Sequence, residues 1–187
     1  ASPYYMFQPL AAERAAAALP TTTFVAMLRD PIERTISHWA EQTRNGIEVL
    51  SLADALAAED DRVGDDAQRL AAGTLAVSNA HEQQSYASQS EYADSLQRWI
   101  DLVGRDRLLV TFSEEYYADS TGTLRTITDT IGVGPMPSAK TASHRNAAPR
   151  PAQFDTAIEA RLVERFRPDV SRIADIIGRI PPWPRFT

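Results

Sequence analysis

The sequence predicts an α/β fold, a three-layer arrangement in which helices cover a parallel sheet on both faces. Two short apolar runs have the composition of buried strands, and each is followed by a segment with helical periodicity. Strands and helices that alternate in this way form parallel sheets with right-handed crossovers. The length of 187 residues corresponds to one ordinary domain. We therefore expect a single domain over residues 1–187, with additional helices around the sheet.

The first strand is expected between two helices. Residues 9–18 are rich in alanine, the strongest helix former, and predict a short helix. Residues 21–28 are β-branched and apolar, which is typical of a strand buried on both faces. Asp30 is a favourable N-cap and Pro31 fits a first helical turn, so a helix should begin here and reach about Thr43.

The middle of the chain is predicted to be mostly surface. Residues 51–82 have helical composition but few large apolar side chains, and we interpret them as surface helices and a mobile loop. The acidic residues from Glu59 to Asp66 should lie on a solvated face. An amphipathic helix follows and ends at Gly104. Its apolar face comprises Tyr92, Leu96, Trp99 and Ile100.

The second strand and two more helices complete the predicted fold. Residues 108–112 read as another buried strand, and the helix after it should end at Gly132. Residues 134–151 form the least regular segment, and a loop of this length is typical of function. A final amphipathic helix is expected over residues 157–178, kinked or divided at Pro168.

Composition narrows the classes of function. The formal net charge of −6 argues against nucleic-acid binding, and no apolar run approaches the ~18 residues that span a bilayer. The absence of cysteine excludes disulfides and thiolate chemistry. His81 and His144 have no carboxylate at metal-ligand spacing, so no metal is expected. Cytoplasmic localisation is the default expectation.

Arg29 and Ser37 form the strongest candidate site. Arg29 follows the first predicted strand, and Ser37 lies two helical turns further on. Open α/β sheets bind ligands beyond the carboxyl ends of their strands, and an arginine there suits a phosphate. The alternative is that Arg29 or Arg34 forms a salt bridge with a nearby acid, while Asp30 is only a helix cap.

The pattern Arg-Asp-Pro-x-x-Arg-x-x-Ser from Arg29 to Ser37 resembles the 3′-phosphate-binding element of sulfotransferases. Other segments resemble the bacterial and heparan-sulfate-type members of that family in order and spacing. They are residues 2–7, 92–99, 107–110, 113–115 and 166–183. The resemblance implies a fold of the P-loop nucleotide-kinase-like class and 3′-phosphoadenosine 5′-phosphosulfate (PAPS) as sulfuryl donor. The acceptor would be a hydroxyl or amine on a small molecule, lipid or glycan.

The resemblance also implies further contacts with the cofactor. Arg145, Asn146 and Arg150 lie where the family has a basic loop that closes over the nucleotide. The alternative is a solvated linker, since the family's usual Lys-Gly pair is missing. Tyr86 is a candidate for stacking near the adenine, or for simple packing.

Three residues are candidates for the acceptor side of the site. Tyr4 and Tyr5 could line the acceptor cleft, although one of them should belong to the core. His38 could face the acceptor pocket, but a helical histidine beside an aromatic residue is more often packed or at the surface. The pocket itself is expected from the segment 46–82.

The catalytic residues remain unknown at this stage. The family's Gly-rich Lys-x-Gly-Thr-Thr loop, which holds the 5′-phosphosulfate, does not occur in these residues. The family's general base lies close after that loop, so neither is in view. Because Ala1 is not a methionine and no signal segment follows it, we expect an N-terminal segment before it that carries the missing strand and loop. The alternatives are a non-catalytic nucleotide-binding remnant or interaction module, and a P-loop kinase relative.

Overall fold

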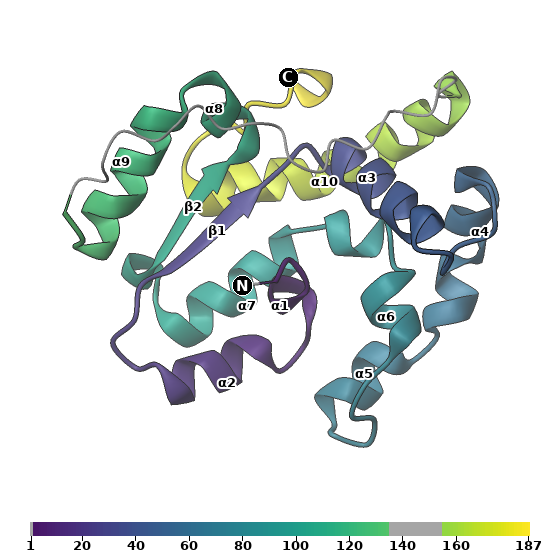
Figure 1. The fold of residues 1–187 in the computed structure, drawn as a ribbon, viewed down its shortest axis with the longest axis horizontal. Coiled ribbons are helices and arrows are strands. Elements are labelled where there is room, and N and C mark those ends of the chain that lie inside the picture. The colour runs from purple at the N-terminus through teal and green to yellow at the C-terminus, as the bar shows by residue number, and fades with distance from the viewer. Residues whose placement is uncertain (1, 135–154) are drawn as a thin grey trace.

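The structure, a computed structural model, describes residues 2–134 and 155–187 and is mostly helical with a small parallel sheet (Figure 1). Strands β1 (Phe24–Leu28) and β2 (Leu108–Phe112) pair in parallel, with Phe24 opposite Leu108 and Leu28 opposite Phe112. The prediction of a mixed α/β fold with parallel strands is confirmed. The described residues give a two-stranded sheet, which does not establish the three-layer arrangement.

Ten α-helices and three short 3₁₀ helices surround the sheet in the described part of the chain. The α-helices are α1 (Tyr4–Phe7), α2 (Ala11–Ala18), α3 (Pro31–Arg44), α4 (Leu52–Val63), α5 (Asp66–Ala71), α6 (Asn79–Gln83), α7 (Ala93–Val103), α8 (Ser113–Ala118), α9 (Ser120–Ile131) and α10 (Thr156–Ile177). The 3₁₀ helices are η1 (Ser88–Ser90), η2 (Arg105–Arg107) and η3 (Pro184–Phe186). None of the helices in these two ranges is long and apolar enough to cross a membrane.

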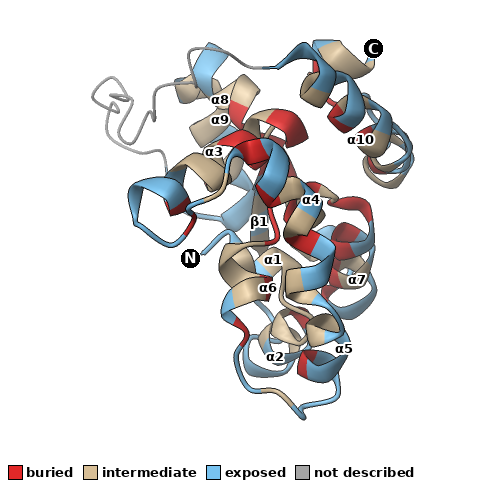
Figure 2. Cartoon of the chain, turned by 90° about the vertical axis from the view of Figure 1, so that its right-hand side faces the viewer, coloured by how far each residue is buried: buried red, intermediate tan, exposed pale blue. Residues whose placement is uncertain are grey.

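The core forms where α7 packs against α2, α10 and β2. Apolar residues on the inner faces of α3, α7, β2 and α10 are almost completely excluded from solvent. They include Ile32, Leu96, Phe112, Phe166 and Ile173. Figure 2 shows that buried and exposed residues share the same helices, as expected for amphipathic helices at the surface of one core.

Strand β1 is shorter and more exposed than predicted. It begins at Phe24 instead of Thr21, and the side chains of Val25 and Met27 are 39% and 46% exposed. Phe24 packs against Trp99 of α7, so one face of the strand is covered and the described residues leave the other open. The prediction of burial on both faces is therefore wrong for this part of the chain.

Two other local predictions also need correction. Glu59 is completely buried in α4, whereas the sequence suggested a solvated acidic face from Glu59 to Asp66. Its neighbours Asp60 and Asp61 in the same helix are exposed, so the error concerns one face of the helix. The final helix continues through Pro168, so it is not divided there, and the kink stays a prediction.

Candidate functional site

The turn between β1 and α3 is fixed by its own sequence. Asp30 Oδ1 accepts hydrogen bonds from the backbone N–H groups of Ile32 (2.9 Å) and Glu33 (3.2 Å). Pro31 occupies the first helical position, where its missing N–H is not needed. This N-cap confirms the predicted start of the helix. The carboxyl end of β1 thus leads directly into a helix N-terminus, a favourable place for an anion.

Two neighbouring elements hold the same turn from outside. Glu114 Oε1 accepts a hydrogen bond from the backbone N–H of Asp30 (2.9 Å), and its Oε2 accepts one from Trp183 Nε1 (3.2 Å). The Tyr92 hydroxyl donates to the carbonyl oxygen of Arg29 (3.0 Å). The backbone that carries Arg29 is therefore positioned by α7 and α8 as well as by its own helix cap.

The Arg29 side chain keeps access to solvent. It is 42% exposed, and its nearest ionic contact is Glu33 Oε2, 3.9 Å from Nη2. An exposed pair this long contributes at most about 1 kcal/mol. Ser37 lies one helical turn beyond Glu33, is partly exposed, and has no hydrogen-bond partner in the part of the chain described. The ion pair with Glu33 is the salt bridge of the alternative interpretation, yet the Arg29 side chain stays accessible to solvent and the Ser37 hydroxyl has no partner in the described residues.

Arg185 joins this turn although the sequence analysis did not select it. Its guanidinium donates to Asp30 Oδ2 (3.1 Å), Glu33 Oε1 (3.0 Å) and Glu159 Oε1 (2.6 Å). Burial raises the pKa of Asp30, and the charge and hydrogen bond of Arg185 act against that rise. No local sequence signal reveals these pairs, because more than 150 positions separate Arg185 from Asp30 and Glu33.

Arg34 has neutral partners. It donates to Gln89 Oε1 (2.7 Å) and Ser90 Oγ (3.3 Å), and burial lowers the pKa of its guanidinium. The suggested salt bridge from Arg34 to an acid is absent from the ion pairs of the described residues. Arg34 instead ties α3 to η1.

Tyr86 is completely buried, and its hydroxyl donates to Glu48 Oε2 (2.9 Å). Burial would raise the pKa of Glu48, but hydrogen bonds from Arg62 at 2.5 Å, the Leu50 N–H and Tyr86 outweigh it and lower that pKa to about 2. Burial and the Glu48 carboxylate raise the pKa of Tyr86. This position agrees with the packing alternative.

The acceptor-side candidates lie in separate surroundings. His38 packs its ring edge-on to Tyr86, with centroids 5.1 Å apart, and its Nδ1 is buried without a hydrogen-bond partner in the described residues. Burial, assisted by the charge of Arg34, lowers the pKa of His38 to about 3. The Tyr4 hydroxyl lies 2.8 Å from His81 Nδ1, while Tyr5 is 57% exposed.

Burial and nearby carboxylates raise the pKa of Tyr4 to about 12. The remaining predicted cofactor residues, Arg145, Asn146 and Arg150, lie outside the described residues.

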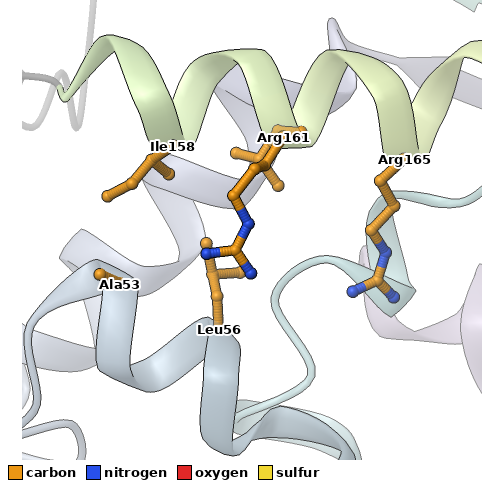
Figure 3. A pocket seen from close by; sticks show the side chains of 6 residues that line it. Ala53, Leu56, Ile158, Arg161 and Arg165 are labelled. Carbon is orange, nitrogen blue, oxygen red and sulfur yellow. The ribbon is translucent and has the colours of Figure 1, made fainter.

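A small pocket of about 180 Å³ lies between α4 and α10 (Figure 3). Two arginines and four apolar residues line it: Ala53, Leu56, Ile158, Arg161, Leu162 and Arg165. Arg165 Nε pairs with Glu91 Oε1 (2.9 Å), whereas Arg161 has no ion-pair partner among residues 2–134 and 155–187. This lining suits a small anion with an apolar part. In residues 2–134 and 155–187, no three histidine, cysteine, aspartate or glutamate side chains are grouped so that they could hold a metal ion.

Comparison with solved structures places this geometry in a known fold. A crystal structure of a sulfotransferase from Alicyclobacillus acidocaldarius is similar, with a TM-score of 0.71 and 24% sequence identity. The similarity covers 94% of this chain and 62% of that chain. No protein-family model and no curated protein matches the sequence. The chain therefore has a sulfotransferase-like fold and spans about three fifths of the length of that sulfotransferase.

Proposed function

We propose that this protein is a PAPS-dependent sulfotransferase in which Arg29 and Ser37 bind the 3′-phosphate of the donor. The observation that carries the proposal is the turn after β1. The accessible guanidinium of Arg29 lies just before a capped helix N-terminus, at the carboxyl end of a parallel strand, and the Ser37 hydroxyl, which has no hydrogen-bond partner among the described residues, lies two turns into the same helix. A sulfotransferase-like fold supports the choice of donor.

The chemistry of the two side chains fits a phosphate. An arginine stays charged at all physiological pH values and donates two hydrogen bonds in a plane that matches phosphate oxygens. Ser37 adds a neutral donor from the next turn of α3. Arg145, Asn146 and Arg150 remain proposed contacts from the segment before α10.

Sulfuryl transfer also requires stabilisation of charge on the migrating group and a base for the acceptor proton. Neither Arg29 nor Ser37 supplies these. We propose that the phosphosulfate-binding loop and its strand belong to sequence outside these 187 residues, and that residues 1–187 are the rest of one domain. The 62% coverage of the solved sulfotransferase supports this, and the open face of β1 at Val25 and Met27 is where a further covering element would pack.

The acceptor is proposed to be a hydroxyl or amine on a small molecule, lipid or glycan. Ala53 and Leu56 of the pocket between α4 and α10 come from the segment in which the sequence predicts the acceptor site. Arg161 and Arg165 would favour an acceptor that carries a negative charge. Tyr4, Tyr5 and His38 remain weaker candidates.

The test is calorimetric titration with adenosine 3′,5′-bisphosphate, ADP and ATP. We expect the bisphosphate to bind most tightly, and Arg29→Ala to weaken it by about ten- to a hundredfold because a charged hydrogen bond contributes about 1.5–3 kcal/mol. Ser37→Ala should cost less, since it removes a neutral donor. Arg125→Ala is a matched control, because Arg125 is exposed on α9 and pairs only loosely with Asp129.

Equal binding of the three nucleotides, or an unchanged affinity in Arg29→Ala, would refute the cofactor assignment. Preference for ADP or ATP would favour a kinase relative. Tight bisphosphate binding without transfer by a chain extended to include the phosphosulfate loop would favour a non-catalytic remnant.

A further inference from the structure

The turn that carries Arg29 is surrounded by carboxylates, which is unexpected for a site that binds an anion. Asp30, Glu33 and Glu114 each have an oxygen within 4 Å of an atom of the turn or of the Arg29 side chain. Carboxylates at this distance attract the guanidinium of Arg29 and repel a phosphate. Another positive group must offset this attraction of Arg29 and this repulsion of the phosphate if Arg29 is to bind the donor.

Arg185 is placed to offset them. Its Nη1 and Nη2 lie 3.1 Å from Asp30 Oδ2 and 3.0 Å from Glu33 Oε1, both closer than the 3.9 Å between Arg29 and Glu33. Glu33 therefore spans the two arginines, with its shorter contact to Arg185. The third contact, from Nε to Glu159 on α10, fixes the plane of the Arg185 guanidinium.

The segment around Arg185 is itself anchored. The Trp183 ring is completely buried, packs edge-on to Phe112 with centroids 5.4 Å apart, and donates its indole N–H to Glu114. Pro184 restricts the backbone between the two residues, and the Phe186 N–H donates to the Trp183 carbonyl (3.0 Å). Arg185 thus reaches the turn from a segment that is anchored in the core.

We infer that Arg185 is a positioning residue for the nucleotide site: it takes the shorter ion pair with Glu33 and balances the charge of Asp30, and so leaves the Arg29 guanidinium available to the 3′-phosphate. This rests on the proposed function. Arg185 acts through the two carboxylates and is not itself assigned a contact with the nucleotide. Without it, Glu33 turns to Arg29, and the phosphate must break that ion pair to bind.

The experiment compares the affinity for adenosine 3′,5′-bisphosphate across matched charge variants by calorimetry. Arg185→Gln should weaken binding about fivefold, the factor that corresponds to breaking one exposed ion pair. Arg172→Gln is the control, because Arg172 on α10 also pairs with a carboxylate, Asp94 at 2.6 Å, which does not belong to the turn. It should leave the affinity within about twofold.

Two double variants separate positioning from net charge. Arg185→Gln with Glu33→Gln removes the carboxylate that would capture Arg29, and should restore the affinity. Arg185→Gln with Glu159→Gln has the same net charge but leaves Glu33 in place, and should stay weak. Equal rescue by both double variants would overturn the inference, as would an unchanged affinity in Arg185→Gln.

Glu33→Gln alone keeps the inference testable if Arg185→Gln does not fold. It should bind the bisphosphate at least as tightly as the wild type, and weaker binding would overturn the inference. A folded wild type that binds no bisphosphate would refute the proposed function and the inference together. A wild type that binds normally beside an equally tight Arg185→Gln would refute the inference alone.

Discussion

Glu59 offers the sharpest test of the structure, because its carboxylate has no exposed surface and accepts hydrogen bonds from three donors at the start of η1. It accepts hydrogen bonds from the backbone N–H of Ala87 (2.9 Å), the backbone N–H of Ser88 (2.8 Å) and the Ser88 hydroxyl (2.6 Å). Glu59→Ala removes the acceptor for all three. The hydroxyl can rotate to another partner, but the two backbone groups cannot.

The expected loss follows from these two orphaned groups. A buried donor left without a partner costs about 1–3 kcal/mol, and because Ser88 is only partly buried we expect about 2–4 kcal/mol in total. That is a large share of the roughly 5–15 kcal/mol that stabilises a typical domain. With a urea m-value of about 2 kcal/mol per molar, the unfolding midpoint should fall by about 1–2 M.

Urea denaturation followed by circular dichroism measures this effect, with Asp60→Ala as the matched control. Asp60 is the next residue of α4 and is exposed, so its loss should change the free energy of unfolding by less than about 0.5 kcal/mol. Glu59→Gln should fall between the two, since it retains one acceptor oxygen. Midpoints for Glu59→Ala and Asp60→Ala that agree within error would refute the buried placement of Glu59.

Three other substitutions test the surroundings of the site. Arg62→Ala removes the cation that pairs with the buried Glu48 carboxylate, and should lower the free energy of unfolding, measured in urea, by about 1–3 kcal/mol. An unchanged free energy would mean that the other hydrogen-bond donors to Glu48 stabilise its charge without Arg62. His38 is held neutral, so stability should fall as the pH drops from about 6.5 toward about 3, because the unfolded chain takes up the proton first. In His38→Phe, the melting temperature should depend less on pH between pH 7 and pH 5 than it does in the wild type. The same pH dependence in both proteins would contradict a buried neutral imidazole. The Asp169 carboxylate accepts hydrogen bonds from the two backbone N–H groups at the start of α7 (2.8 and 3.0 Å), so Asp169→Ala should lower the free energy of unfolding by about 1–2 kcal/mol. Asp175→Ala, at an exposed position of the same helix, should cause no measurable loss.

Local patterns predicted the parts of the fold that depend on neighbours in sequence. The cap at Asp30 needs only residues two and three positions ahead, and the apolar face that contains Leu96 and Trp99 repeats with the helical period. The pairing of β1 with β2 followed from two apolar runs joined by helices. These features were predictable because the physical cause lies within a few residues or repeats along the chain.

The exposure of single side chains was not predictable in this way. Glu59 sits among exposed acids, yet the arrival of η1 beside α4 buries it and provides its three donors. Val25 and Met27 have the composition of a buried strand, but in the described residues their face of β1 is open. Both depend on what packs against an element, which composition does not encode.

The sequence by itself determined that Arg29 follows a strand and that Ser37 lies two turns into the helix that begins directly after it, because strand propensity, helix caps and helical spacing are local. The tertiary structure alone decided what surrounds them. It brought Glu114, Tyr92 and Arg185 to the turn from three distant segments. Ion pairs and hydrogen bonds between segments so far apart produce no repeating pattern in the sequence, since they depend on how the core packs.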